Sequence, residues 1–242
     1  MAEMQLDAAD FQSELPVQHI HLYFEDEELG LSVGVWDTTS MQEAFGPYPG
    51  DEFMWVLEGQ VSLVDGDGGA TLVEQGQTFC VRNAIPISWK QQGYLRKFFM
   101  ICANPNASTP DISSAHGGVM ILDPVALEVG MTNLETTDPF VIERDAPLQR
   151  DNILFTNDAG NMFVGMWDST PFKSEMSPFP CHELVQLLEG EVEITEGDGA
   201  VHLFRAGDAF FIPMGTVCSW RTVGYIKKFY SILEPATDSA AR

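Results

Sequence analysis

The chain of 242 residues carries 36 acidic and 12 basic side chains, so its formal net charge is −24. A surface of this sign repels phosphate groups, and we therefore expect neither a nucleic acid nor an anionic membrane as a partner. The sequence lacks an apolar run long enough for a transmembrane helix, and residues 1–5 lack the pattern of a secretory signal, so a cytoplasmic location is expected.

Short runs of β-branched and aromatic residues follow one another along the chain, and Gly, Pro, Asp and Asn separate them. This pattern predicts an all-β sandwich or barrel. We expect little helix, a turn or two near residues 8–13 and in the connector. In the first half, strands are predicted over 53–57, 61–64, 71–73 and 79–81, with turns at 58–59, 65–69 and 75–76.

The connector begins at residues 104–110, which have the composition of a linker. From residue 117 the chain becomes apolar again, and we expect extended strands over 119–122 and 125–129. Residues 236–242 have the composition of a frayed end. The predicted division is an N-terminal domain over 1–104, a linker over 105–118 and a C-terminal domain over 119–242.

An internal repeat is the strongest feature of the sequence. Residues 15–101 align with residues 146–232 at a constant offset of 131 and without a gap. The segment Val-Gly-Val-Trp-Asp at 33–37 matches Val-Gly-Met-Trp-Asp at 164–168, and Leu-Glu-Gly recurs at 57–59 and 188–190. A match of this length indicates a duplicated domain.

Each half resembles a cupin barrel at two motifs. Glu52 and Gly59 have the cupin spacing of the first motif, and so do Glu183 and Gly190. Gly207, Pro213 and Gly215 fit the second motif, with Cys218 at the position of its histidine. The wider pattern is similar to the cupin group of ethanolamine-utilisation and ureidoglycine-aminohydrolase-like proteins. The resemblance implies two tandem jelly-roll barrels, a bicupin.

Metal-binding members of this superfamily hold a divalent ion with histidines and one glutamate, and the resemblance places the His-x-His pair six and four residues before the motif glutamate. Those positions are Gly46 and Tyr48 in the first half, and Ser177 and Phe179 in the second. We therefore predict no metal and no other cofactor. Glu183 with Cys218 is the one plausible ligand pair inside a single barrel, and a zinc site normally needs three protein ligands.

The remaining histidines and cysteines receive structural interpretations. His182 neighbours Glu183 on a strand and must point to the opposite face, so we expect it at the surface or an interface. His19 and His21 share a strand face, His202 is expected in solvent, and His116 has no evident partner. The four cysteines form no C-x-x-C pair and are expected to be free thiols, Cys80, Cys102, Cys181 and Cys218.

Four residues that can face a barrel interior recur in both halves. Trp36, Glu52, Trp89 and Lys97 return as Trp167, Glu183, Trp220 and Lys228. A buried glutamate needs a partner, and each lysine lies on a strand from which it could reach that glutamate. The pair is either a structural ion pair or an acid/base couple. The tryptophans are either core residues or aromatic walls for a cationic or planar ligand.

The second half keeps more of the cupin pattern and is predicted to be the functional barrel. Glu183 and Lys228 are its candidate catalytic residues. Its candidate ligand-binding residues are Trp167, Phe179, Cys218 and Trp220, and those of the first barrel are Trp36, Glu52, Trp89 and Lys97. Tyr48, Met54 and Trp55 are expected to fill the first cavity more fully.

Three functions remain open on this basis. The first is a bicupin that binds a small organic metabolite, such as an amine or an amino-acid derivative, without an obligatory metal and with acid/base chemistry in the second barrel. The second is a metal-dependent hydrolase or lyase of nitrogen metabolism, as the resemblance implies. The third is a non-catalytic accessory or sensor protein. A homodimer through sheet edges is also expected.

Overall fold

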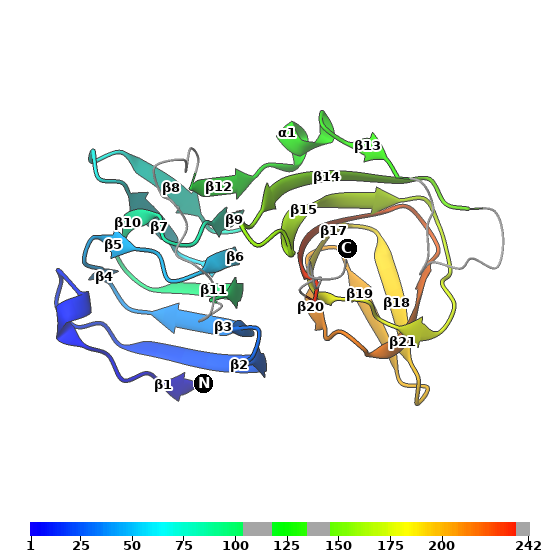
Figure 1. Ribbon diagram of the computed structural model, residues 1–242, viewed down its shortest axis with the longest axis horizontal. Helices are drawn as coiled ribbons and strands as arrows, with labels where there is room; N and C mark the ends of the chain where they lie inside the picture. Colours follow the sequence, from blue (N-terminus) through cyan, green and yellow to red (C-terminus); the bar gives the residue numbers. More distant parts are fainter. Residues whose placement is uncertain (104–117, 135–145, 236–242) are drawn as a thin grey trace, which may run out of the picture. The chain divides into compact units, whose positions relative to one another are not determined.

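The computed structural model describes residues 1–103, 118–134 and 146–235. The chain divides into two compact units, Met1–Leu122 and Asp123–Arg242, and both consist mainly of strands (Figure 1). The predicted all-β fold of two tandem barrels is therefore confirmed. The division follows Leu122 rather than residue 118, because residues 119–122 pair with a strand of the first unit. Most of the expected linker lies outside the described residues.

In its described residues, the first unit forms a seven-stranded and a five-stranded sheet. The order in the larger sheet is β1 (Ala2–Glu3), β2 (Gln18–Asp26), β3 (Leu31–Thr38), β11 (Leu95–Cys102), β6 (Asp51–Glu58), β9 (Thr78–Val81) and β12 (Val119–Leu122). In the smaller sheet, β10 (Pro86–Gln91) pairs with β4 (Met41–Gln42), β5 (Gly46–Pro47) and β7 (Gln60–Val64), and β8 (Ala70–Glu74) follows β7.

The second unit repeats this topology in the part of the chain that the structure covers. Its larger sheet has the order β13 (Thr132–Asn133), β14 (Gln149–Thr156), β15 (Met162–Ser169), β22 (Ile226–Leu233), β17 (His182–Glu189) and β20 (Ala209–Ile212). Its smaller sheet has the order β16 (Ser177–Pro178), β21 (Val217–Thr222), β18 (Glu191–Glu196) and β19 (Val201–Arg205). Strands that lie 131 residues apart in the sequence thus occupy equivalent places in the sheets of the two units.

The duplication extends further toward the N-terminus of each unit than the sequence alignment does. The backbone amide of Met4 donates to the Gln18 carbonyl, and the amide of Leu134 donates to the Gln149 carbonyl, each at 2.9 Å. The strands β1 and β13 therefore occupy equivalent places beside β2 and β14. Fourteen residue positions separate Met4 from Gln18 and fifteen separate Leu134 from Gln149, so one residue more separates the second arm from its barrel, and a gapless alignment at an offset of 131 does not include the arms.

The predicted turns have two different roles. The turn over residues 65–69 closes a true hairpin, since β7 and β8 pair directly and the Asp65 amide donates to the Gly69 carbonyl at 2.9 Å. The turns at Gly59 and Gly76 instead carry the chain from one sheet to the other, because β6 and β9 belong to the larger sheet. These corners let the two sheets enclose a core. Side chains of both contribute to it, Met54 and Val56 from one sheet and Val61 and Leu63 from the other.

Helix is scarce, as predicted. The 3-10 helix η1 (Ala8–Asp10) lies within the expected segment 8–13. The expectation of a strand over 125–129 is wrong, because residues Pro124–Glu128 form the helix α1. Asp123 caps it by accepting the Val125 amide at 2.8 Å, and Pro124 occupies the first turn, where its missing N–H costs nothing. These two start signals were present in the sequence.

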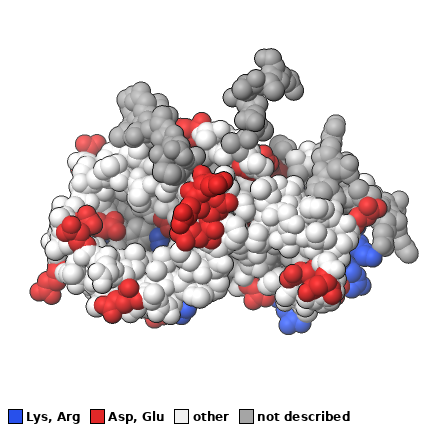
Figure 2. Space-filling model, turned by 60° about the horizontal axis from the view of Figure 1, so that its bottom comes forward, with Lys and Arg blue, Asp and Glu red and all other residues white. Residues whose placement is uncertain are grey.

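Acidic side chains are far more widespread than basic ones on the face shown in Figure 2, in agreement with the composition. Within the described residues, no helix is long and apolar enough to cross a bilayer. The predictions about nucleic acids, membranes and dimerisation stay predictions.

Candidate functional site

A buried ion pair lies inside each barrel and joins two neighbouring strands. Lys97 of β11 donates from Nζ to Glu52 Oε1 of β6 at 2.7 Å, and Lys228 of β22 donates to Glu183 Oε1 of β17 at 2.6 Å. Each of the four side chains is no more than 8% exposed. The prediction that each lysine reaches its glutamate is therefore confirmed. In each antiparallel strand pair, the residue directly opposite the glutamate lies four positions after the lysine. The long lysine side chain spans this distance along the strand.

The recurrent tryptophans contact these lysines. Lys97 Nζ lies 5.1 Å from the centre of the Trp36 ring and 4.7 Å from that of Trp89. Lys228 Nζ has the same relation to Trp167 and Trp220, at 4.9 and 4.8 Å. Both tryptophan pairs are buried in the cores. The two tryptophans of each barrel thus already contact the ammonium group of a lysine. A cationic ligand therefore has to be recognised by other groups.

The two barrels differ at the residue four positions before the motif glutamate. In the first barrel, the Tyr48 hydroxyl donates to Glu52 Oε2. Burial and the neighbouring Glu52 carboxylate raise the pKa of Tyr48 well above its ordinary value. In the second barrel, Phe179 takes this place and stacks on Trp220 at 5.8 Å between ring centres. Phe172 packs edge-on against Trp167 at 6.0 Å.

The first barrel contains a cavity of about 790 Å³. Trp36, Glu52, Trp89 and Lys97 all line it, so four candidate residues meet at one site. The expectation that the first cavity is more fully filled is wrong. Met54 and Tyr48 do pack inside, but Trp55 points to the other face of its sheet and stacks on Phe98 at 5.9 Å. The second barrel has a smaller cavity of about 340 Å³.

The candidate residues of the second barrel do not meet in this way. Of the residues selected there, Cys218 lines the smaller cavity, whereas neither Glu183 nor Lys228 belongs to its lining. The rings of Trp167, Phe179 and Trp220 pack into the core. The catalytic role of Glu183 and Lys228 stays a prediction, and their geometry is that of a buried ion pair.

Sequence reasoning missed three acidic residues of the first cavity, Asp10, Glu25 and Glu43. The N-terminal arm carries Asp10 to the cavity, where the Asp10 carbonyl accepts the Ala44 amide at 2.7 Å and Phe11 forms a β-bridge with Glu43. The pKa of Glu43 is raised to about 7, chiefly by burial, with smaller contributions from the Glu52 and Asp10 carboxylates and against the opposing effect of Lys97. The one available signal was that Glu43 breaks the repeat, which has Ser174 at the equivalent position.

The residues at the cupin ligand positions do not fit a divalent ion. Gly46, Tyr48, Ser177 and Phe179 offer no imidazole, and a lysine ammonium already binds each motif glutamate. Burial raises the pKa of Cys218, which keeps the thiol protonated and a poor ligand. Across residues 1–103, 118–134 and 146–235, no group of three or more His, Cys, Asp or Glu is arranged to hold a metal. The prediction of a metal-free protein stays a prediction.

The described histidines do not line the first cavity. The expected position of His182 at the surface or an interface is wrong, since it is 4% exposed within its own chain, stacks on Phe211 at 6.1 Å and accepts the Met214 amide at 3.3 Å. It still faces away from Glu183, as neighbours on a strand do. His202 is half exposed and pairs with Glu196 at 2.7 Å. His116 lies outside the described residues.

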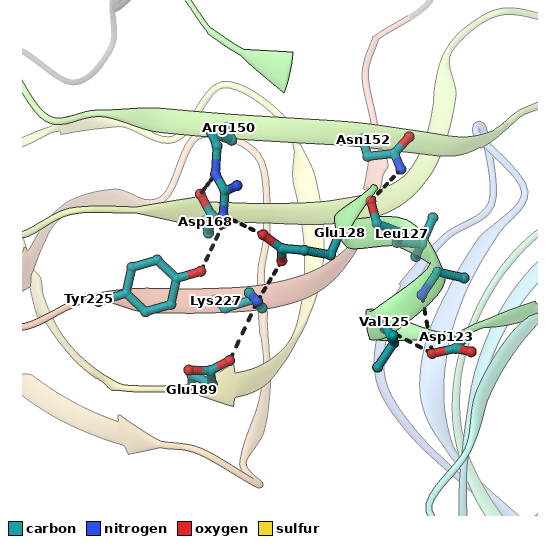
Figure 3. Close-up of polar contacts among 11 residues, drawn as sticks. Asp123, Val125, Leu127, Glu128, Arg150, Asn152, Asp168, Glu189, Tyr225 and Lys227 are labelled. Carbon is teal, nitrogen blue, oxygen red and sulfur yellow. Dashed lines mark hydrogen bonds and ion pairs between the residues drawn. The ribbon is translucent and has the colours of Figure 1, made fainter. Parts of the chain in front are cut away.

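A network of charged side chains links α1 to the second barrel (Figure 3). The buried Asp168 accepts Arg150 at 2.5 and 3.1 Å and the Tyr225 hydroxyl at 2.8 Å. Glu128 of α1 pairs with Arg150 and Lys227, both at 2.8 Å. In the first barrel the equivalent pair is His19 with Asp37, also at 2.8 Å. The network therefore fastens α1, which has no counterpart in the described part of the first unit.

We expect Asp168→Asn to lower the unfolding free energy by about 1 to 3 kcal/mol, because the buried carboxylate accepts three charge-assisted or hydroxyl hydrogen bonds. Arg150 is 35% exposed and can turn to water, which limits the loss. The control is Glu189→Gln, whose side chain is 57% exposed and lies 3.5 Å from Lys227. Its effect should stay within about 0.5 kcal/mol. Urea denaturation measures the unfolding free energy of both variants. Equal losses would contradict the stabilising role of the Asp168 carboxylate.

The shared strand order and the glycine turns that join the two sheets of each unit define a double-barrel cupin. Residues 156–230 match the model of the EutQ-like cupin domain. These findings support a cupin-superfamily protein of the EutQ-like type, and the fold is consistent with the binding of small molecules. The comparison with curated proteins finds no significant match.

Solved structures support the same fold over most of the chain. A protein of unknown function of the DUF861 family from Pseudomonas syringae is 28% identical, with a TM-score of 0.76 over 87% of this chain and 85% of that one. A cupin 2 conserved barrel domain protein from Leptotrichia buccalis is 10% identical, with a TM-score of 0.58 over 92% and 91%. The protein Ylba from E. coli is 11% identical, with a TM-score of 0.53 over 98% and 88%.

Proposed function

We propose that the protein binds a small organic molecule that carries an ammonium group, in the cavity of the first barrel and without a metal. The observation that carries this proposal is the composition of the cavity wall. Asp10, Glu25, Glu43 and Glu52 supply four carboxyl groups, and Lys97 is the one basic residue among the lining residues identified. Because Lys97 already balances Glu52, the remaining carboxyl groups favour a positively charged guest.

The apolar part of the wall suits the organic portion of such a molecule. Trp36, Phe99 and Ile101 line the cavity beside the acidic groups. A volume of about 790 Å³ lies within the range of small-molecule sites, which are mostly apolar with a few polar groups that fix orientation. These features support an amine or an amino-acid derivative more than a carboxylate. The proposal differs from the sequence-based preference for the second barrel.

A charge series of similar ligands tests the proposal. Benzylamine, benzyl alcohol and benzoate share a ring and differ in charge, and their binding can be measured by isothermal titration calorimetry and thermal shift. We expect benzylamine to bind and to raise the melting temperature, and benzoate to do neither. Binding of benzoate in preference to benzylamine, or of none of the three, would contradict an ammonium site.

A matched pair of variants places the ligand in one barrel. A Cβ atom added at Gly46 meets no atom within 4 Å, and Gly46 lines the first cavity. Gly46→Leu should therefore fill part of the cavity without disturbing the fold and weaken benzylamine binding at least about tenfold, or about 1.4 kcal/mol. The equivalent substitution in the second barrel, Ser177→Leu, should leave the affinity unchanged. A loss in Ser177→Leu alone would move the site to the second barrel.

A further inference from the structure

Glu43 occupies a fixed place in the wall of the first cavity. Its amide donates to the Trp89 carbonyl at 2.8 Å, and its own carbonyl accepts the Ser88 hydroxyl at 2.6 Å. Together with the β-bridge to Phe11, these bonds hold the backbone on both sides. The side chain is part-buried and lines the cavity. Its carboxyl group therefore faces the cavity from a rigid position.

The groups around this carboxyl are two carboxyl groups, one hydroxyl and the Lys97 ammonium, whose effect does not cancel that of burial and of the carboxylates. Asp10 faces it from η1, Glu52 from β6, Lys97 from β11, and Tyr48 from the segment before β6. Lys97 is bound to Glu52, and no hydrogen bond or ion pair reaches the Glu43 carboxyl from any described residue. Part-burial and two neighbouring carboxylates oppose ionisation, so the pKa of Glu43 rises to about 7.

The repeat shows that the barrel does not need a carboxyl group at this position. Ser174 takes the place of Glu43 in the second barrel, where its hydroxyl accepts the Trp220 amide at 2.9 Å and donates to the Glu175 carbonyl at 3.2 Å. Ser174 thus serves the fold, and it lies in the barrel with the smaller cavity. Glu43 makes no such bond from its side chain within the described residues. Its carboxyl group is free to serve a ligand.

We propose that Glu43 is the residue that selects the cationic ligand, and that the ammonium group of the ligand replaces the proton that this carboxyl holds in the free protein. The inference rests on the proposed function of the first cavity. On binding, the Glu43 O–H bond breaks, the proton passes to solvent, and the carboxylate pairs with the incoming ammonium. No other bond changes, so no oxidant or second reactant is required.

The sign of the pH dependence follows from this exchange. Above pH 7 the carboxyl of the free protein is ionised, and the ammonium binds without displacing a proton. Below pH 7 the proton must leave, so the affinity falls toward tenfold for each pH unit. Between pH 8 and pH 6 we expect benzylamine, which stays protonated in this range, to bind about tenfold more weakly. At pH 7 binding should release about half a proton.

The free protein offers a second test that needs no ligand. Because the folded-state pKa of Glu43 is raised above its unfolded value, its protonation stabilises the fold at low pH, and this contribution is lost as the pH rises from about 4.5 through about 7. The melting temperature of the wild type relative to Glu43→Gln should therefore decline across this interval. A difference that stays constant with pH would show that Glu43 holds no proton at neutral pH.

Calorimetry with benzylamine on the full chain completes the test, at pH 6, 7 and 8 and in two buffers of different ionisation enthalpy. Glu43→Gln should bind weakly at every pH and release no proton. The control Glu74→Gln removes an exposed carboxyl of β8 outside the lining of this cavity and should keep both the pH dependence and the proton release. Binding by the wild type without either would overturn this inference and leave the proposed function intact. No binding at any pH would overturn the proposed function itself.

Discussion

Lys228→Met is expected to lower the unfolding free energy by about 3 to 5 kcal/mol, because it leaves the Glu183 carboxylate buried without its counter-charge. Glu183 is 2% exposed and Lys228 is the cation bound to it, at 2.6 Å. A loss of this size should lower the melting temperature by roughly 10 to 20 °C. Urea denaturation followed by circular dichroism measures it. A loss below about 1 kcal/mol would show that Glu183 is hydrated or protonated in the fold.

Two further variants separate the cost of an unpaired charge from the value of the pair. The double variant Glu183→Leu with Lys228→Met replaces the pair by apolar side chains and should regain most of the lost stability. Lys97→Met makes the same change in the first barrel, where Glu52 keeps the Tyr48 hydroxyl and borders a cavity that admits water. We expect a smaller loss there, about 1 to 3 kcal/mol. Equal losses of unfolding free energy in Lys97→Met and Lys228→Met would contradict the inference that Glu52 is better compensated than Glu183 by its surroundings.

Gly190→Ala is expected to destabilise the second barrel by about 3 kcal/mol or more. Gly190 ends the Leu-Glu-Gly motif with φ at +83°, a backbone conformation that costs a residue with a Cβ about 1 to 2 kcal/mol. The added Cβ would also lie against the Tyr225 carbonyl oxygen, far closer than such atoms tolerate. Because that oxygen belongs to the backbone of a turn, it cannot move without shifting β22. Gly59 has the same relation to Tyr94 in the first barrel.

Gly207→Ala isolates the conformational part of this effect. Gly207 has φ at +94°, but a Cβ there meets nothing within 4 Å. Its substitution should cost only the strain of the positive φ, about 1 to 2 kcal/mol. Thermal denaturation of the two variants side by side gives the comparison. Similar losses of stability in Gly190→Ala and Gly207→Ala would mean that the close approach of Gly190 to the Tyr225 carbonyl does not contribute to the effect.

The residues that could be predicted from sequence are those whose role depends on local pattern or on the repeat. The all-β fold, the duplication and the hairpin at 65–69 followed from spacing and turn residues, and all three are confirmed. The Glu–Lys pairs followed because a buried carboxylate needs a partner and the repeat kept both members. The helix α1 was missed although Asp123 and Pro124 mark its start, because the apolar run after them favoured a strand.

The sequence did not show which of the two barrels contains the larger cavity. Tyr48, Met54 and Trp55 are larger than or equal to their counterparts, and side-chain size alone suggested a filled first cavity. The space left in a core depends on which face each side chain takes and on the segments that close the barrel. Trp55 lies on the other face of its sheet, whereas Phe172 and Phe179 stack on the tryptophans of the second barrel.

By itself, the sequence determined two copied β-barrels, the glycines of their corners and a lysine within reach of each motif glutamate, because these depend on alternation along a strand and on residue type. Only the tertiary structure decided that the first barrel keeps a large cavity, that the N-terminal arm brings Asp10 to it, and that Glu43 lines it without an ion pair from the described residues to its carboxyl group. The physical reason is that burial, and with it the pKa of a carboxyl group, depends on neighbours brought together from four separate segments of the chain.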